Sequence, residues 1–123
     1  KCQPFLYLCT KRTKMTQTQK VQVLLETLKL IPTPHQWRHD VSFEEACNDA
    51  PPITLSCAPE KGHIAVMGSY DNRSSVMNRL RFIIYVNYFW RTGIHPIYSF
   101  GKHPATTHAE VVGVLQKAIK TFQ

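Results

Sequence analysis

The segment NRLRFIIYVNYFWRTG, residues 78–93, decides the fold class of this chain of 123 residues. Its side chains alternate in character with the two-residue period of a β-strand. One face is apolar and suits a core; it carries Leu80, Phe82, Ile84, Val86, Tyr88 and Trp90. The other face mixes cations with aromatic and other residues; it carries Arg79, Arg81, Ile83, Tyr85, Asn87, Phe89 and Arg91. We therefore predict a long strand here, which turns through residues 91–93 into a second strand at residues 95–100.

Further short apolar or aromatic runs, bounded by turn residues, predict three more strands. These runs are PFLYLC (4–9), ITLSC (53–57) and HIAVMGSY (63–70). Apolar residues at helical spacing predict a helix from Thr18 to the prolines at positions 32 and 34, and another from His108 to Phe122. The inward side chains of the last helix are Val111, Leu115, Ala118 and Phe122. A Ser-x-x-Glu pattern at residues 42–45 predicts a short helix as far as Asn48.

Together these elements predict a single domain over residues 1–123 with an α+β fold. We expect a mostly antiparallel sheet of four to five strands with two main helices packed on it. The order of elements also suits a thioredoxin-like or a deaminase-like layer as alternatives. Because the chain has no Cys-x-x-Cys pair, which thioredoxin redox chemistry requires, we do not expect an oxidoreductase.

The charge balance is consistent either with an acidic partner or simply with a surface that keeps the protein in solution. The chain has 15 Lys and Arg against 8 Asp and Glu, a formal net charge of +7. Such a surplus attracts nucleic acid or an anionic membrane surface. No apolar run reaches the roughly 18 residues of a membrane-spanning helix, so we expect no membrane span.

Three features bear on the compartment. Four cysteines occur in a chain that is large enough to fold without disulfides, so we expect an intracellular reducing compartment or an organelle. The triplet Asn72-Arg73-Ser74 would accept a glycan in a secreted protein, but we interpret it as a turn. The chain begins with Lys1 rather than Met, from which we expect a processed product or a fragment.

Residues 101–115, GKHPATTHAEVVGVL, resemble the first half of the signature of zinc-dependent nucleobase deaminases, such as the tRNA-adenosine and riboflavin-pathway enzymes. In that family a His binds zinc, a Glu two positions later transfers protons, and a following Pro-Cys-x-x-Cys supplies the other ligands. The resemblance implies that His108 binds zinc and that Glu110 is the general acid and base. The second half of the signature is missing, because no cysteine follows Glu110.

The same residues have a structural interpretation. Thr107 and Glu110 fit the Thr-x-x-Glu pattern of a capping box. In that motif the Thr hydroxyl accepts from the Glu110 amide, and the Glu carboxylate accepts from the Thr107 amide. A carboxylate is also favoured at the positive end of the helix dipole. We therefore favour a helix start over a metal site.

A second zinc site can be drawn from His35 and His39, four residues apart, with Cys47 and Cys57. The prolines at positions 32 and 34 argue against the helix that would align the two histidines. We therefore interpret these four residues as loop histidines and small core cysteines.

We predict a non-catalytic basic domain, without a cofactor, that binds RNA or is a structural subunit of a ribonucleoprotein or other large assembly. Arginines beside aromatic rings offer phosphate contacts and stacking platforms to single-stranded nucleic acid. The residues expected to bind are Arg79, Arg81, Tyr85, Phe89 and Arg91, together with Lys11, Arg12 and Lys14. The alternatives are a zinc-dependent nucleobase deaminase or decayed deaminase-like domain, and a protein–protein interaction module.

Overall fold

The computed structural model describes residues 14–41, 47 and 50–123, and helices dominate this part of the chain. The α-helices are α2 (Gln17–Leu30), α3 (Ala58–Met67), α4 (Ser75–Tyr88), α5 (Pro96–Lys102) and α6 (His108–Phe122). Two short 3-10 helices are η1 (Pro34–Gln36) and η2 (Phe89–Arg91). Strands β1 (Trp37–Arg38) and β2 (Ile53–Thr54) pair in parallel, with Trp37 opposite Ile53.

The predicted α+β fold is therefore wrong. Within the described residues the sheet has two parallel strands, instead of four to five mostly antiparallel ones. A sheet of this size cannot carry a layer of helices. The thioredoxin-like and deaminase-like layers, which both need a central sheet, are not formed either.

The decisive segment at residues 78–93 forms most of helix α4 and all of η2 instead of a strand. Ser74 begins α4, because its hydroxyl accepts a hydrogen bond from the Met77 amide over 3.2 Å and so satisfies a free N–H of the first turn. The apolar residues also fit the helical period, and those that are buried are Val76, Met77, Leu80, Ile83 and Ile84. The strand prediction required Phe82, Val86 and Trp90 to be buried, and all three are more than half exposed.

The other predicted strands are also replaced or shortened. Residues 63–67 of the run at 63–70 belong to α3, which has Pro59 in its first turn and ends at Gly68 with a φ of 78°, the pairing typical of helix ends. The run at 95–100 lies mostly in α5, which begins at Pro96. Only Ile53–Thr54 of the run at 53–57 is a strand. The predicted strand at 4–9 and the short helix that begins at residue 42 lie outside the described residues.

Two helix predictions are confirmed. Helix α2 covers the first predicted helix, and α6 has the predicted bounds. The four inward residues predicted for α6 are all buried. The capping box at its start is also formed, because Thr107 Oγ1 accepts from the Glu110 amide over 3.2 Å and Glu110 Oε1 accepts from the Thr107 amide over 2.9 Å.

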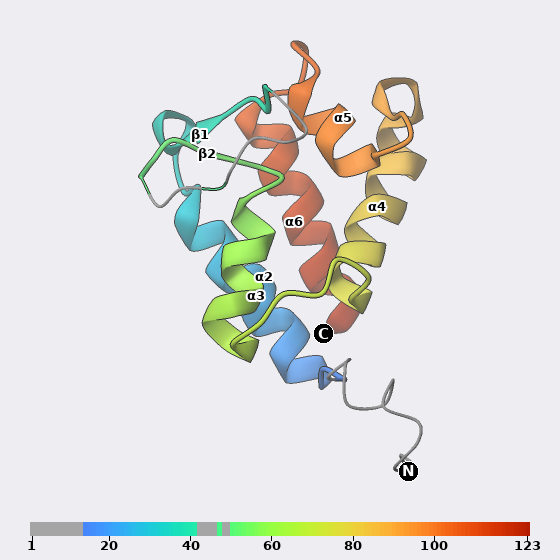
Figure 1. Ribbon diagram of the computed structural model, residues 1–123. Coiled ribbons are helices and arrows are strands. Elements are labelled where there is room, and N and C mark those ends of the chain that lie inside the picture. The colour runs from blue at the N-terminus through green and yellow to red at the C-terminus, as the bar shows by residue number, and fades with distance from the viewer. Residues whose placement is uncertain (1–13, 42–46, 48–49) are drawn as a thin grey trace.

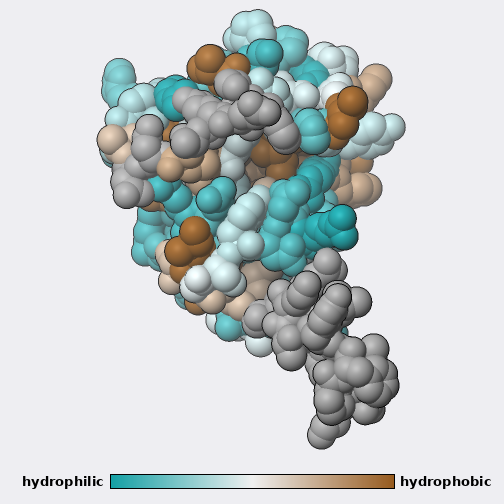
Figure 2. Space-filling model, viewed as in Figure 1, coloured by the Kyte–Doolittle hydropathy of each residue, from teal (hydrophilic) through white to brown (hydrophobic). Residues whose placement is uncertain are grey.

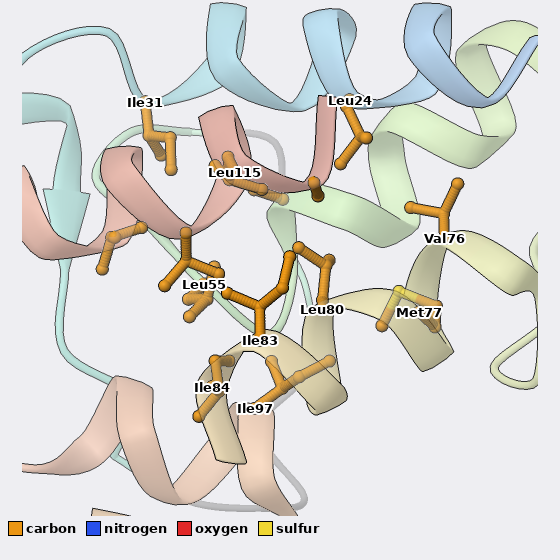
Figure 3. Packing of buried hydrophobic residues seen from close by; sticks show 14 of the residues in the cluster. Leu24, Ile31, Leu55, Val76, Met77, Leu80, Ile83, Ile84, Ile97 and Leu115 are labelled. Atoms are coloured by element: carbon orange, nitrogen blue, oxygen red, sulfur yellow. The ribbon is translucent and has the colours of Figure 1, made fainter. Parts of the chain in front are cut away.

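Helix α6 runs through the middle of the molecule, with α2 and α3 on one side and α4 and α5 on the other (Figure 1). Helix α2 packs against α3 and α6, and α4 packs against α5 and α6. The core lies where these helices meet, and Figure 3 shows Leu24 of α2, Leu80 of α4 and Leu115 of α6 within it. None of the described helices is both long and apolar enough to cross a bilayer.

A disulfide joins Cys47 to Cys57, ten residues apart. Cys57 directly precedes α3, so the bond ties the segment before β2 to the start of that helix. The interpretation of these residues as small core cysteines left their pairing open, and Cys57 is indeed buried in the core with Cys47 packed against it. Spacing alone could not reveal the pair, because residues ten apart meet only when the intervening chain turns back.

Gly62 lets α3 approach α2 closely. A Cβ at this position would meet the Thr27 hydroxyl and would lie 2.7 Å from the Val23 carbonyl oxygen. The Thr27 hydroxyl donates to that same carbonyl over 2.8 Å, so a shift of either group would break a buried hydrogen bond. In contrast, a Cβ on Gly113 of α6 would meet open space.

We expect Gly62→Ala to lower the free energy of unfolding by about 1–3 kcal/mol, because the added methyl group overpacks the contact between α2 and α3. The matched substitution Gly113→Ala should instead raise it by up to about 1 kcal/mol, because Ala is the better helix former. Urea unfolding followed by circular dichroism measures both. Equal stabilisation by the two substitutions would contradict the close approach at Gly62.

Reduction of the Cys47–Cys57 bond should lower the free energy of unfolding by about 2–3 kcal/mol, because the open chain regains the entropy of a short loop. The double variant Cys47→Ala and Cys57→Ala should show a comparable loss and then no further response to a reductant. Urea unfolding with and without dithiothreitol tests this. A wild-type transition that is unchanged by reduction would contradict the bond.

Candidate functional site

The structure separates the residues that were predicted to bind nucleic acid. Arg79, Tyr85 and Phe89 lie along the outer side of α4 and η2, where Tyr85 and Phe89 are exposed. The Arg79 guanidinium lies 5.3 Å from the centre of the Phe82 ring. Lys14 is exposed just before α2, whereas the residues at positions 11 and 12 lie outside the described part.

The other two predicted arginines are engaged within the protein. Arg81 donates to the Asn72 carbonyl over 2.8 Å and to the Asn78 side chain over 3.0 Å. Arg91 forms an ion pair with Glu110 over 2.9 Å, and only 12% of its side chain is exposed. A continuous face of three arginines beside aromatic rings, as the strand prediction required, is therefore not formed.

A row of exposed apolar side chains follows α4 and η2, and we name it the α4 ridge. It consists of Phe82, Tyr85, Val86, Phe89 and Trp90, each between 55 and 62% exposed. The first four have the spacing i, i+3, i+4 and i+7, so they share one side of the helix. The Trp90 ring meets the Phe89 ring edge to face at 5.3 Å. In Figure 2, brown and tan residues, with paler ones between them, lie along the right-hand side, where Figure 1 shows α4.

Helix α4 is thus apolar on two opposite sides. A helix that covers a core on one side normally turns polar residues to the other, and contiguous exposed apolar groups mark interaction sites. Sequence reasoning had placed Phe82, Val86 and Trp90 in the core, because a strand groups even-numbered positions. The signal that could have separated the two sides is the helical spacing of Leu80, Ile83 and Ile84.

The ridge lies in a stretch of chain without acidic residues. No Asp or Glu occurs between Asp71 and Glu110, a stretch that contains all of α4, η2 and α5. Cations in the same stretch are Arg73, Arg79, Arg81, Arg91 and Lys102. Lys117 of α6 adds another, because it donates to Asn87 on α4 over 3.1 Å. Of these cations, Arg79 lies beside Phe82 of the ridge and Lys117 is bonded to α4, whereas Arg91 is paired with Glu110 and Arg73 and Arg81 line the cavity beside the disulfide.

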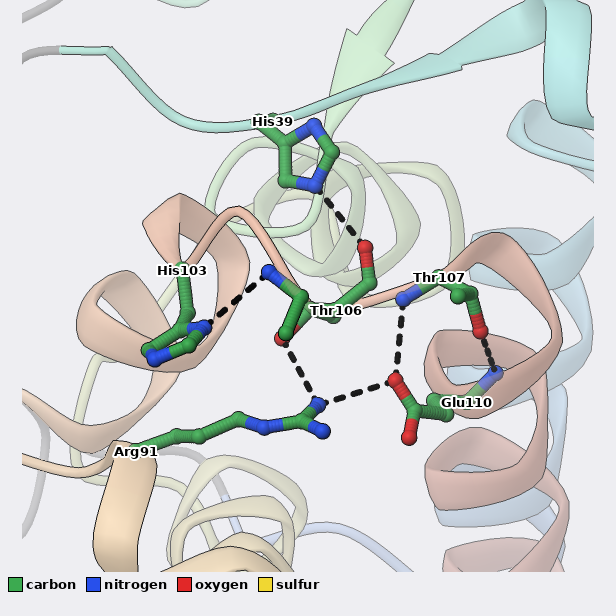
Figure 4. Close-up of polar contacts among 7 residues, drawn as sticks. His39, Arg91, His103, Thr106, Thr107 and Glu110 are labelled. Carbon is green, nitrogen blue, oxygen red and sulfur yellow. Dashed lines mark hydrogen bonds and ion pairs between the residues drawn. The ribbon is translucent and has the colours of Figure 1, made fainter.

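Glu110 has structural partners on both sides (Figure 4). Besides the Thr107 amide, its Oε1 accepts from Arg91 over 2.9 Å, and Arg91 also donates to the Thr106 hydroxyl over 3.2 Å. The hydrogen bond from Arg91 lowers the pKa of Glu110, although partial burial acts in the opposite direction. A carboxylate held ionised in this way is poorly suited to a general acid near neutral pH.

His108 contacts a backbone carbonyl in place of a metal-binding group. Its Nε2 donates to the Ile31 carbonyl over 2.7 Å, and the Trp37 ring lies beside it. Cys47 and Cys57 are joined to each other and offer no thiolate. Within residues 14–41, 47 and 50–123, no three His, Cys, Asp or Glu side chains are grouped to hold a metal. These residues therefore do not fit the zinc site that the deaminase resemblance implies, which needs about three protein ligands.

A buried Ser–His pair escaped the sequence analysis. The Nδ1 of His63 donates to the Pro59 carbonyl over 2.7 Å, and its Nε2 accepts from the Ser74 hydroxyl over 2.8 Å. Burial lowers the pKa of His63, which favours this neutral form. The geometry matches that of an activated serine, but both side chains are buried and Ser74 already begins α4. We therefore assign the pair a structural role.

A cavity of about 540 Å³ lies beside the disulfide. Polar lining residues include Asp40, Glu60, Tyr70, Arg73, Arg81 and Tyr98. The lining contains both carboxylates and guanidinium groups, so it selects no single class of ligand by charge.

Comparison with protein-family models, with curated proteins and with solved structures finds no match to this chain. No activity, ligand or partner can therefore be transferred to it from a relative. Its function must be inferred from its own exposed and charged groups, and among the residues that the structure describes the α4 ridge is the largest set of exposed apolar side chains.

We expect Glu110→Gln to lower the free energy of unfolding by about 1 kcal/mol at neutral pH, because a charge-assisted hydrogen bond to Arg91 becomes a neutral one. The pKa of Glu110 is lower in the folded chain than its ordinary 4.5, so the stabilisation is complete above that value. As the pH falls further, the unfolded state takes up the proton first and the difference from wild type should disappear.

The matched control is Glu26→Gln, which removes an exposed ion pair with Lys29 on α2 and should change stability by less than about 0.5 kcal/mol. Urea unfolding over a series of pH values measures both variants. A Glu110→Gln variant as stable as wild type at neutral pH would show that Arg91 does not hold the start of α6.

Proposed function

We propose that the protein is a non-catalytic binding domain that inserts the α4 ridge into an apolar, acid-rimmed groove of a partner protein. The observation that carries this proposal is the exposure of Phe82, Tyr85, Val86 and Phe89 at the spacing i, i+3, i+4 and i+7. Helices that bind in grooves use side chains at these positions as anchors. Trp90 extends the row beyond the end of α4.

The composition of the ridge supports a protein partner. Large aromatic residues dominate the binding energy of protein interfaces, because they bury much area with few rotatable bonds. The ridge contains four aromatic residues and Val86. An aliphatic side chain offers no ring on which a nucleic-acid base could stack, but it fills an apolar groove well.

The charge around the ridge supports an acidic rim on the partner. Arg79 lies beside Phe82 of the ridge and Lys117 is bonded to Asn87 on the same helix, and complementary charge speeds and orients association. The same charge argues against a second copy of this chain as the partner, because each copy carries a formal charge of +7 and like charges repel.

RNA binding stays a prediction, and the structure offers fewer of the expected arginine contacts for it. Arg79, Tyr85 and Phe89 are available on one side of α4, but Arg81 and Arg91 are held by internal hydrogen bonds. Release of either arginine to a phosphate would break those contacts. We therefore treat single-stranded RNA, like an anionic membrane, as an outcome that the experiment must separate from a protein partner.

The test begins with a photo-crosslinking amino acid in place of Tyr85, followed by identification of the adduct formed in an extract of the source cells. The purified partner is then titrated calorimetrically with wild type, Phe89→Ala and Ile64→Ala. Loss of a central aromatic anchor should cost at least about 2 kcal/mol, or about a 30-fold weaker Kd. Ile64 on α3 is an exposed apolar residue away from the ridge, and Ile64→Ala should leave the Kd unchanged.

Equal affinity of wild type and Phe89→Ala for the partner would overturn the proposal. So would binding of a single-stranded RNA oligonucleotide or of phosphatidylserine vesicles that Phe89→Ala abolishes, with no protein partner found. Sedimentation of the free chain completes the test, because a dimer that dissociates in Phe89→Ala would assign the ridge to a second copy.

A further inference from the structure

The triplet Asn72-Arg73-Ser74 is the single Asn-x-Ser/Thr sequence in the chain, because the asparagines at positions 48, 78 and 87 have neither Ser nor Thr two residues later. With a residue other than proline in the middle, it has the form that accepts N-linked glycans. It lies in the connection between α3 and α4, and Asn72 is exposed. The predicted turn is confirmed at these residues.

The turn leaves the amide nitrogen of Asn72 unused. Asp71 closes the turn, because its Oδ1 accepts from the Arg73 amide over 2.9 Å and its carbonyl accepts from the Ser74 amide over 3.0 Å. The Asn72 Nδ2 donates no hydrogen bond to any residue in the described part of the chain. The hydrogen bonds that close the turn therefore do not require an asparagine at position 72.

The orientation of the Asn72 amide is fixed by its neighbours. Its Oδ1 accepts from Arg81 over 2.6 Å and from the Tyr70 hydroxyl over 3.0 Å. Because a guanidinium can only donate, the atom that faces Arg81 must be the oxygen. Both partners therefore bind the oxygen of the amide. The atom that would carry a sugar takes part in neither of the contacts that hold the side chain.

The Cys47–Cys57 disulfide is a second and independent observation. Such bonds form and persist in oxidising compartments and are rare where glutathione keeps thiols reduced. The lumen of the endoplasmic reticulum is such an oxidising compartment, and N-linked glycans are attached there. The expectation of a reducing environment rested on a chain large enough to fold without disulfides, but the structure joins Cys47 to Cys57.

We propose that the chain matures in the secretory pathway and carries an N-linked glycan on Asn72. In the transfer, Nδ2 forms a bond to C1 of the first sugar of a lipid-pyrophosphate-linked oligosaccharide. The bond from C1 to the pyrophosphate oxygen breaks, the lipid pyrophosphate leaves, and the amide loses one proton to the transferase. The burial of Ser74 is no obstacle, because the triplet is read before the chain folds.

A glycan at Asn72 would lie at the opposite end of α4 from Phe89 and Trp90. The triplet precedes the first turn of α4, whereas Phe89 and Trp90 follow its last turn, and a helix of 14 residues is about 20 Å long. Asn72 and Arg73 line the cavity beside the disulfide, so the glycan would cover that side of the molecule.

The full chain behind a cleavable secretion signal is expressed in cultured animal cells, and the secreted protein is treated with peptide-N-glycosidase. We expect a glycosidase-sensitive mobility shift and, after treatment, aspartate at position 72 in the tryptic peptide. Asn72→Gln should abolish the shift. Ser74→Thr keeps the acceptor triplet and a capping hydroxyl, and it should retain the shift. The same peptide from protein isolated from its source cells should carry the glycan.

Secreted protein with the disulfide formed and Asn72 unmodified would overturn the proposal, and so would an unmodified Asn72 in protein from the source cells. A shift that persists in Asn72→Gln would place the glycan elsewhere and overturn the assignment. If little protein is secreted, cell-free translation with microsomes decides the matter, because the glycan is attached before folding. Translocated wild-type chain without a shift would also count against the site.

Discussion

The apolar side of helix α6 is the surface on which both halves of the molecule pack, and the rest of the structure depends on it. Six of its side chains are buried between α2 on one side and α4 on the other. The capping box at Thr107 and the ion pair from Arg91 to Glu110 fix where this helix begins. A shift in that start would rotate the buried side chains, because each residue advances the helix by a fixed angle.

The exposure of the α4 ridge follows from this packing. Burial of Leu80, Ile83 and Ile84 against α6 fixes the rotation of α4 about its axis. Side chains three and four residues apart share a side of the helix, so Phe82, Tyr85 and Val86 are directed outward as a group. Removal of exposed aromatic side chains from water is favourable. The proposed partner would gain binding free energy by covering them.

The arginines of α4 and η2 divide into two roles by position. Arg91 forms an ion pair with Glu110 at the start of α6 and lies over the ring of Tyr88. Arg81 binds Asn72 and so orients the turn before α4. Arg79 remains beside Phe82 on the outer side. One helix thus connects a turn suited to a glycan, a core face and an apolar ridge, and each occupies a separate part of its surface.

The sequence by itself determined α2 and α6, including the capping box at Thr107, because their apolar residues fit one period and their ends carry clear signals. It could not determine α4, because residues 78–93 are apolar at both helical and strand spacing. Only the tertiary structure chose between the two, through a capped start at Ser74 and the neighbouring surface of α6. The disulfide and the ridge also depend on the tertiary structure, because they arise from residues that meet, or are left uncovered, only after the chain has folded.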